Sequence, residues 1–229
     1  MKLLLSNDDG YDAPGLAALV EAAQPLGELA VVAPAEPQSC MSHAVTMGVG
    51  MRSREYGQGN LALYGTPADC IRVGLLRVAP QAKWVLSGIN HGGNLGVDIY
   101  YSGTVAAVRE AVLHGWPGIA VSHFRKGGLE YDWARVVPWV RTVLQDLMAR
   151  PVSPGLFYNV NLPHLAPGEP DPQVVFCPLD QHPLPLSFRP DEEGRLFYDG
   201  NYHSRQRQIG ADVDVCFSGN IAVTEVHLF

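Results

Sequence analysis

The stretch KLLLSNDDG at residues 2–10 decides the fold expected for this chain. Its apolar run, residues 2–6, has the length of one buried strand and is far too short to cross a membrane. Two adjacent carboxylates, Asp8 and Asp9, follow directly. Ligands bind beyond the carboxyl ends of strands in an open parallel sheet. The stretch therefore predicts a ligand site at a strand end, with a solvated Asp-Asp-Gly turn as the alternative.

A helix and a second strand are expected after the acidic turn. Residues 14–24 carry apolar side chains at helical spacing, at Leu16, Leu19, Val20 and Ala23. Pro14 suits the first turn of that helix and Gly27 suits its end. Residues 28–33 form a second apolar run. Because a crossover helix joins the two runs, their strands should lie parallel.

Further elements alternate along the chain. A hairpin is expected within residues 46–64, broken by Gly57 and Gly59, and a helix should follow Thr66 and run to about Arg77. Strands are expected at residues 84–87 and 118–122, with a helix from about Gly103 to His114 between them. Residues 131–149 show helical periodicity, in which Pro138 should kink the helix or mark its start.

The pattern changes after Pro151, where short strands separated by Pro, Gly and Asp replace the helices. We therefore predict an α/β fold with a doubly wound, mostly parallel sheet. Residues 1–150 should form its core, and residues 151–229 a β-rich extension packed on the core or used for subunit contacts.

Composition narrows the class of protein. The 229 residues are 47% hydrophobic and 17% charged, which predicts a globular domain rather than a disordered chain. A net charge of −7 without a basic run argues against a duplex nucleic-acid partner. The four cysteines form no CxxC pair, and no signal peptide or membrane-spanning segment is evident. A cytoplasmic location is the expectation.

Three loops should open on one edge of the sheet, because they leave the carboxyl ends of parallel strands. They span residues 7–12, 34–43 and 88–103. Their oxygen-bearing side chains form a partial ligand shell suited to Mg²⁺ or Mn²⁺, made of Asp8, Asp9, Ser39, Ser42, Asn90 and Asn94.

The segment YSGTV at residues 101–105 adds an expected anion site. Ser102 and Thr104 flank Gly103 at the start of a helix, whose first N–H groups are unpaired and favour phosphate. A metal site and a phosphate site on one edge indicate phosphate-ester chemistry. Ser102 acting only as the helix N-cap is an equally good interpretation.

Other side chains near this edge have open roles. His43 and His91 neighbour the candidate ligands and are at most auxiliary acids or bases, and loop histidines are more often surface polar residues. Tyr100, Tyr101 and Trp116 could stack on a base, although core packing is the usual role of such residues.

Several ordered motifs resemble the SurE family, the stationary-phase survival proteins, which are metal-dependent nucleotidases. The motifs are LLLSNDDG, APGL, VVAP, GTPADC, SGIN, NLG, YSGTVAA and NVNLP. They cover about residues 1–163, whereas the tail matches poorly. The resemblance implies a Rossmann-like α/β domain with a β-rich extension used in dimer formation, as a homodimer or a dimer of dimers.

The resemblance also implies an activity and its residues. One divalent ion, Mg²⁺ or Mn²⁺, would be held by Asp8, Asp9, Ser39 and Asn90, of which the two acids are also the catalytic candidates. Phosphate would be bound by Asn94, Ser102, Gly103 and Thr104. The expected reaction is hydrolysis of nucleoside 5′-monophosphates, extending to 3′-monophosphates, with loose preference for the base.

The chain departs from the family pattern in the serine loop. It reads QSCMSH at residues 38–43, so that Gln38 stands for an arginine and Cys40 for a glycine of the family's usual RSGxS. Because of this altered loop, a catalytically weak nucleotide-binding protein on the same fold is the alternative to an active enzyme. The chain also stops early, at VTEVHLF, and this departure concerns the extent of subunit exchange and the size of the oligomer.

Overall fold

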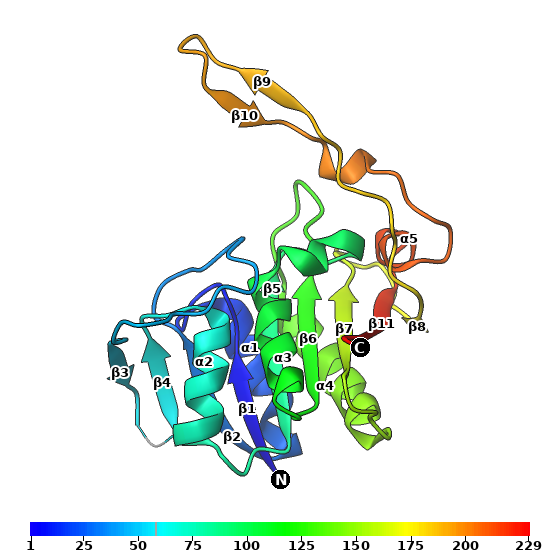
Figure 1. Ribbon diagram of the computed structural model, residues 1–229. Coiled ribbons are helices and arrows are strands. Elements are labelled where there is room, and N and C mark those ends of the chain that lie inside the picture. Colours follow the sequence, from blue (N-terminus) through cyan, green and yellow to red (C-terminus); the bar gives the residue numbers. More distant parts are fainter. Residues whose placement is uncertain (58) are drawn as a thin grey trace.

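Nine strands form one sheet in this computed structural model, which describes residues 1–57 and 59–229. They are β1 (Lys2–Ser6), β2 (Glu28–Pro34), β3 (Ser53–Glu55), β4 (Asn60–Leu63), β5 (Trp84–His91), β6 (Gly118–His123), β7 (Leu156–Leu162), β8 (Val174–Phe176) and β11 (Ile221–His227). Their order across the sheet is β3-β4-β2-β1-β5-β6-β7-β11-β8 (Figure 1).

The sheet is mostly parallel. Strands β4, β2, β1, β5, β6 and β7 all run in one direction. At one edge β3 is antiparallel to β4, and near the other β11 is antiparallel to β7. The predicted α/β class with a mostly parallel sheet is therefore confirmed, and so is the hairpin around Gly57 and Gly59.

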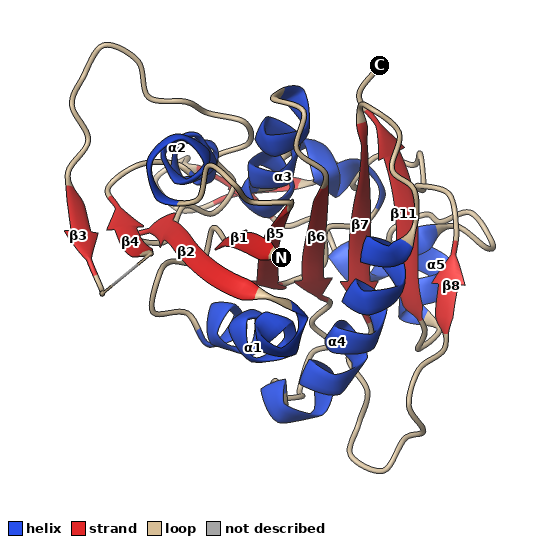
Figure 2. Cartoon of the chain, turned by 90° about the horizontal axis from the view of Figure 1, so that it is seen from below, coloured by secondary structure: helices blue, strands red, loops and turns tan. Residues whose placement is uncertain are grey.

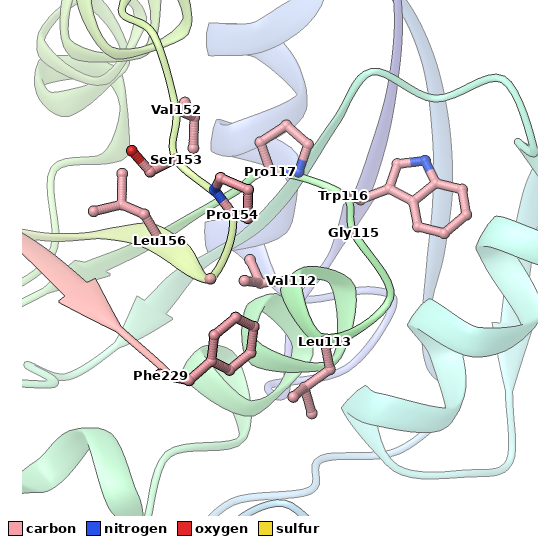
Figure 3. Close-up of a pocket in the computed structure, with 11 residues that line it drawn as sticks. Val112, Leu113, Gly115, Trp116, Pro117, Val152, Ser153, Pro154, Leu156 and Phe229 are labelled. Atoms are coloured by element: carbon pink, nitrogen blue, oxygen red, sulfur yellow. The ribbon is translucent and has the colours of Figure 1, made fainter.

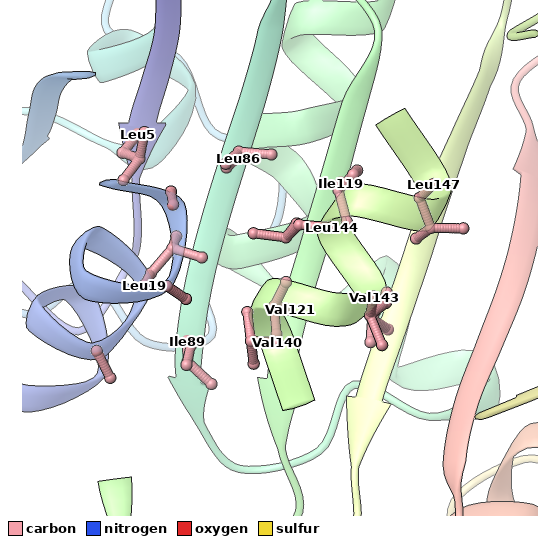
Figure 4. Packing of buried hydrophobic residues seen from close by; sticks show 14 of the residues in the cluster. Leu5, Leu19, Leu86, Ile89, Ile119, Val121, Val140, Val143, Leu144 and Leu147 are labelled. Atoms are coloured by element: carbon pink, nitrogen blue, oxygen red, sulfur yellow. The ribbon is translucent and has the colours of Figure 1, made fainter. Parts of the chain in front are cut away.

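Helices cover both faces of the sheet. Figure 2 shows α1 (Pro14–Ala23) and α4 (Trp133–Ala149) on one face, and α2 (Pro67–Val73) and α3 (Gly103–Leu113) on the other. Consecutive strand residues point to opposite faces, so Leu5 belongs to the core cluster that contains Leu19 and Leu144 (Figure 4). Leu4 belongs to the cluster on the other face, which contains Ile71. Burial on both faces explains why these strands read as continuous apolar runs.

Two helix predictions need refinement. The capping box of α2 is present, since the Thr66 hydroxyl accepts from the backbone of Asp69, but α2 ends at Val73 and continues as a π-helical turn, Gly74–Val78. Helix α4 begins at Trp133, with Asp132 as its N-cap, and runs through Pro138. The alternative that Pro138 marks its start is wrong, because the Asp132 carboxylate stabilises an earlier first turn.

Strand β5 is longer than predicted. It was expected to end at Ser87 but continues through SGIN to His91. Asn90 and His91 pair there with Ser122 and His123 of β6, after an irregularity in the ladder that follows Ser87. The glycine at position 88 therefore does not end the strand. The consequence is that Asn90 is held by the sheet itself.

Residues after 150 contribute to the same sheet and to a projecting arm, which lies between Asp180 and Tyr202. Strands β7, β11 and β8 join the sheet, α5 (Asp212–Phe217) packs beside β11, and β9 (Phe188–Pro190) pairs with β10 (Leu196–Tyr198) in a hairpin that leaves the body (Figure 1). The division into residues 1–150 and 151–229 stays a proposal about folding units. Within the described ranges, every helix is too short or too polar to cross a membrane.

Candidate active site

A cleft of ≈ 520 Å³ opens at the carboxyl ends of β1 and β5, beside the loop that follows β2. Six of the predicted site residues line it, namely Asp8, Asp9, Ser39, Asn90, Asn94 and Ser102. The other two, Gly103 and Thr104, lie against the side chain of Asp8. The remaining lining residues are Cys40, His91, Gly92, Gly93, Asp98, Tyr101, Leu184, Leu186, Tyr198 and Tyr202.

Asp8 is buried between the end of β1 and the first turn of α3. Its Oδ1 accepts a hydrogen bond from the Thr104 hydroxyl. A Cβ added at Gly103 would lie 2.8 Å from the Cβ and from Oδ2 of Asp8, so only glycine permits this approach. Burial raises the pKa of Asp8 to about 6, and the charge of Asp9 adds to the rise, whereas the Thr104 hydrogen bond opposes it.

Asp9 turns to the neighbouring strand. Its Oδ2 accepts from the backbone N–H of His91, at 3.0 Å, so the carboxylate lies at the end of β5 near Asn90. In the part of the chain described, neither Asp8 nor Asp9 forms an ion pair with a side chain. Two carboxylates on one cleft without a cationic partner are unfavourable unless a cation or a proton joins them.

Ser39 belongs to a loop that is fastened at several points. The backbone N–H of Gln38 donates to the carbonyl of Asp8 at 2.7 Å. Further on, the Ser42 hydroxyl donates to the carbonyl of Tyr100 at 2.7 Å, and His43 bonds to the buried Glu110 of α3 at 2.8 Å. These contacts hold the loop along α3 and keep the exposed Ser39 at the cleft.

Cys40, which stands for a glycine of the resembled family, adopts the backbone conformation that glycine favours. Its φ is +59°, in the left-handed region that L-residues rarely occupy. Ser42 has a φ of +52°, so the loop contains a second such residue. The loop therefore keeps a glycine-type path in spite of the substitution, at a cost in backbone strain.

Asn90 lines the cleft, and its two side-chain polar atoms differ in their partners. Its Nδ2 donates to the carbonyl of Gly92 at 2.9 Å, and within the described ranges no hydrogen-bond donor contacts its Oδ1. The amide nitrogen is thus used locally, which leaves the carbonyl oxygen as the group available to a cation.

Asn94 sits in a cage of polar side chains from β6 and β7. Its backbone N–H donates to Asn161 Oδ1 at 2.8 Å, and its carbonyl accepts from Asn159 at 2.8 Å and from Asn161 at 3.0 Å. Its own Nδ2 donates to the Ser122 hydroxyl at 2.7 Å. The NVNLP motif therefore positions the turn that carries Asn94, a role that was not predicted for it.

The start of α3 combines capping with the contact to Asp8. The Ser102 hydroxyl accepts from the backbone N–H of Val105 at 3.0 Å, so Ser102 is the N-cap, as one of the two interpretations had it. Thr104 is fully buried and its hydroxyl is taken by Asp8. The positive end of the α3 dipole therefore faces the cleft beside Asp8.

The two candidate histidines are placed differently. His91 lines the cleft, and its Nε2 accepts from the backbone N–H of Gly15 at 3.3 Å. His43 is absent from the described lining of the cleft, and its ring is held by Glu110. Of the two, His91 is therefore the histidine that borders the cleft, and its ring also packs against Trp133.

Several cleft residues were missed by sequence reasoning. Asp98 lies in a 3₁₀ turn, Gly96–Tyr100, between two motifs that were recognised, and Leu184, Leu186 and Tyr198 come from the arm about 90 residues later. No local spacing links the arm to the strand ends. The apolar and aromatic composition of the tail was its only signal.

The donor set at the cleft fits a divalent ion of the hard type. Asp8, Asp9, Ser39 and Asn90 offer carboxylate, hydroxyl and amide oxygens on one cleft, the chemistry that Mg²⁺ and Mn²⁺ prefer. Three or more His, Cys, Asp or Glu side chains do not gather as a metal centre anywhere in the described ranges. The proposed set has only two such residues, so it differs from a zinc-type site.

A second cavity, of ≈ 350 Å³, lies at the opposite end of the strands, where β6 and β7 begin. Figure 3 shows Trp116, Pro117, Leu156 and Phe229 around it, and Ser153 is the one polar side chain among its described lining residues. Trp116 is therefore remote from the cleft and does not serve as a base-stacking residue there. Of the three aromatic candidates, Tyr101 alone is among the residues described as lining the cleft.

Comparisons with known proteins agree with this architecture. The family model described as "Survival protein SurE" matches residues 3–182. A relative from Nostoc sp. is 48% identical over the whole of both chains. The 5′-nucleotidase SurE of Myxococcus xanthus is 38% identical, over 99% of this chain and 87% of that protein.

A solved structure shares the fold. The crystal structure of the SurE protein from Aquifex aeolicus superposes with a TM-score of 0.87 at 30% identity, covering 100% of this chain and 94% of that one. The family match spans most of the residues that build the sheet and the cleft. This chain belongs to the SurE family.

Proposed function

We propose that this chain is a divalent-metal-dependent phosphomonoesterase that hydrolyses nucleoside 5′-monophosphates to nucleoside and phosphate. The observation that carries the proposal is the pair Asp8 and Asp9, which share one cleft beside the positive end of α3 and have no cationic partner in the described chain. Relatives that carry the name 5′-nucleotidase SurE support the substrate class. We extend the proposal to nucleoside 3′-monophosphates, with loose preference for the base.

The ion would be held by Asp8, Asp9, Ser39 and Asn90, and would be one Mg²⁺ or Mn²⁺. When bound, it supplies Lewis acidity to the phosphoryl oxygens and lowers the pKa of the attacking water. The Thr104 hydroxyl fixes one carboxylate and the His91 N–H fixes the other, so both acids are oriented before any ligand arrives. Such preorganisation is what a ligand site requires.

The phosphate would bind at Asn94, Ser102, Gly103 and Thr104. The α3 dipole offers partial positive charge there, which favours a doubly charged phosphate monoester next to two acids. Because the side chains of Ser102 and Thr104 already have partners, we assign the contacts with phosphate to the peptide groups of this turn.

The proposed reaction is direct displacement by water. Water forms the new bond to phosphorus, the bond from phosphorus to the nucleoside oxygen breaks, and that oxygen takes a proton as it leaves. Phosphatases that form an aspartyl-phosphate typically have a D-x-D arrangement, whereas the acids here are adjacent and each is fixed by a hydrogen bond. Water attack predicts inversion at phosphorus, with His91 as an auxiliary acid or base at most.

A phosphate-release assay tests the function. The protein is treated with EDTA, dialysed and assayed on nucleoside 5′- and 3′-monophosphates, with and without added Mg²⁺ or Mn²⁺. Release that depends on added metal is the expected result. Nucleotide binding without release would favour the alternative, a catalytically weak nucleotide-binding protein, for which the strained loop at Cys40 is the structural reason.

A labelling experiment tests the chemistry. In a single turnover in ¹⁸O-water, the label should enter the released phosphate and not the protein. Recovery of ¹⁸O in Asp8 or Asp9, or a trapped phosphoenzyme, would show that a carboxylate is the nucleophile.

We further propose a homodimer, or a dimer of dimers, in which the β-rich extension takes part. Its arm carries exposed apolar side chains, with Phe188 57% and Leu196 70% exposed. The substrate is the only ligand besides the metal that we propose, with no duplex nucleic acid and no membrane. The cytoplasmic location stays a prediction.

A further inference from the structure

The cleft has two chemically different sides. Its floor carries the acids and amides described above, whereas its outer wall carries Leu184, Leu186 and Tyr198 from the arm, with Tyr101 from the turn before α3. These wall residues are largely open to solvent, with Leu186 89%, Tyr101 57% and Tyr198 50% exposed. Apolar side chains beside a polar ligand site are suited to contact the apolar part of a ligand whose polar part binds at that site.

The arm is anchored close to the floor of the cleft. Asp98 accepts from the Tyr202 hydroxyl at 2.6 Å and pairs with the buried Arg205 at 3.0 Å. On the other side of the arm, the backbone N–H of Asp180 donates to Asp212 at 2.8 Å, and the same carboxylate accepts from Gly96 at 2.7 Å. Both ends of the arm are thus tied to the turn Gly96–Tyr100, next to Asn94.

The ring of Tyr198 is itself fixed. Its hydroxyl donates to the carbonyl of Pro185 at 2.7 Å, and this carbonyl lies between Leu184 and Leu186 in the chain. The ring of Phe188 contacts it edge-on, with centroids 5.6 Å apart. Only glycine fits at position 200, because a Cβ there would lie 2.3 Å from the Tyr198 hydroxyl oxygen. The Tyr198 ring is therefore fixed beside the segment that carries Leu184 and Leu186.

We propose that this wall, made of Leu184, Leu186 and Tyr198 with Tyr101, binds the base of the nucleotide. The inference rests on the function proposed above, since it takes the phosphate to lie on the floor of the same cleft. An aromatic ring and aliphatic side chains accept any base through its flat face. Because the wall offers few hydrogen-bonding groups, the preference among bases is predicted to be weak.

The test compares two substrates that share sugar and phosphate. Steady-state hydrolysis is measured on a nucleoside 5′-monophosphate and on ribose 5-phosphate, which lacks the base. Tyr198→Ala should raise KM for the nucleotide about tenfold and leave ribose 5-phosphate unchanged, since stacking on one aromatic ring typically contributes that much. Leu186→Ser, at an exposed position outside the core, should give the same pattern with a smaller rise.

Phe197→Ala is the matched control. It is the next residue along β10, points to the opposite side of the strand, and is absent from the described cleft lining. It should leave the ratio of the two KM values unchanged. Equal changes for both substrates in Tyr198→Ala, or an unchanged ratio in Tyr198→Ala and Leu186→Ser, would overturn the base wall while leaving the nucleotidase intact. A parent protein that hydrolyses neither substrate would instead overturn the proposed function, and this inference with it.

Discussion

Asp8 is a residue of the cleft whose charged form is disfavoured by burial. The fold buries its carboxyl group beside that of Asp9, which raises the pKa of Asp8 to about 6. Within the protein, the charged form is stabilised by the Thr104 hydroxyl and by the positive end of α3. Such an arrangement is retained where a ligand completes it, because a buried charge without a partner is strongly unfavourable.

The fit between Gly103 and Asp8 predicts a graded loss of activity. Gly103→Val should displace the carboxylate and lower kcat/KM further than Thr104→Ala, which removes only one donor to Asp8. The measurement is kcat/KM for a nucleoside 5′-monophosphate, with circular dichroism to check the fold. Small and equal effects from both substitutions would place the reacting phosphate elsewhere.

Cys40 offers a test of strain in the serine loop. Cys40→Gly should raise the free energy of unfolding by about 1 kcal/mol, because glycine adopts a φ of +59° without a Cβ clash. Cys40→Ala keeps the Cβ and is the control, for which no such gain is expected. Urea unfolding of both variants against the parent measures the difference, and equal gains would show that strain is not the cause.

At the residue scale, the sequence predicts what lies next to a strand end. Asp8, Asp9 and Ser102 are found from local pattern, because a strand followed by acids and a helix cap are local features. Asp98 and Tyr198 are not found in this way, since their place at the cleft depends on contacts between segments that are far apart in the chain.

Among the elements, the loop over α3 is held to the helix itself by the contact of His43 with Glu110. His43 and His114 bind the same Glu110, at 2.8 and 3.0 Å, but His43 belongs to the loop and His114 to the end of α3. His43→Ala should therefore increase amide hydrogen exchange around Ser39 and raise the metal concentration needed for activity severalfold.

His114→Ala is the control for this prediction, because it removes a partner of Glu110 without touching the loop. It should leave exchange in residues 38–46 and the metal requirement unchanged. The same response in both variants would mean that Glu110, rather than the tether of the loop, is what matters.

His123, the last residue of β6, should make the stability of the protein depend on pH. Burial, with the charges of His164 and His91, lowers the pKa of His123 from 6.5 to about 3. The folded state thus keeps the ring neutral while the unfolded state takes up a proton below pH 6.5. This contribution to stability is complete above pH 6.5 and falls as the pH drops, by about 2 kcal/mol between pH 7 and pH 5.

His123→Gln isolates this contribution. Asp212 works in the opposite direction, because burial raises its pKa to about 6, so the difference in pH dependence between variant and parent is the quantity to measure. Urea unfolding at pH 7 and pH 5 should show the variant losing less stability than the parent. Parallel changes in both proteins would contradict the buried neutral histidine.

Element boundaries were predicted where a local signal marks them and missed where packing decides. The Thr66 capping box and the Gly57 and Gly59 turn are local, and both were found. The extension of β5 to His91 is not local, because pairing with β6 carries the strand past Gly88. Pro138 is tolerated inside α4, whose packing against the sheet and α1 outweighs its missing hydrogen bond.

For the whole molecule, the exposed arm leads us to expect that copies of this chain associate. A two-stranded hairpin with exposed aromatic residues is marginal on its own, and its open edges favour pairing with another copy. Light scattering at micromolar concentration should give at least a dimer, and Phe188→Ser combined with Leu196→Ser should lower the average mass. A monomeric parent would refute this expectation.

The parallel part of the sheet could be predicted because its strands are apolar runs joined by helices. The common direction of β1, β2 and β5 follows from crossover connections. The return of β11 to the sheet beside β7 could not, since an antiparallel pair of strands about 60 residues apart has no sequence period.

Phosphate release by an Asp8 variant is the most direct test of the proposed nucleotidase site. Asp8→Asn keeps the shape of the side chain and removes its charge, and Asp12→Asn makes the same change at an exposed position of the following turn. With a nucleoside 5′-monophosphate and Mn²⁺, Asp8→Asn should lower kcat/KM at least about 100-fold while the fold is kept, and Asp12→Asn should match the parent. Parent-like activity of Asp8→Asn at the same metal concentration would contradict the assignment of this cleft as the nucleotidase site.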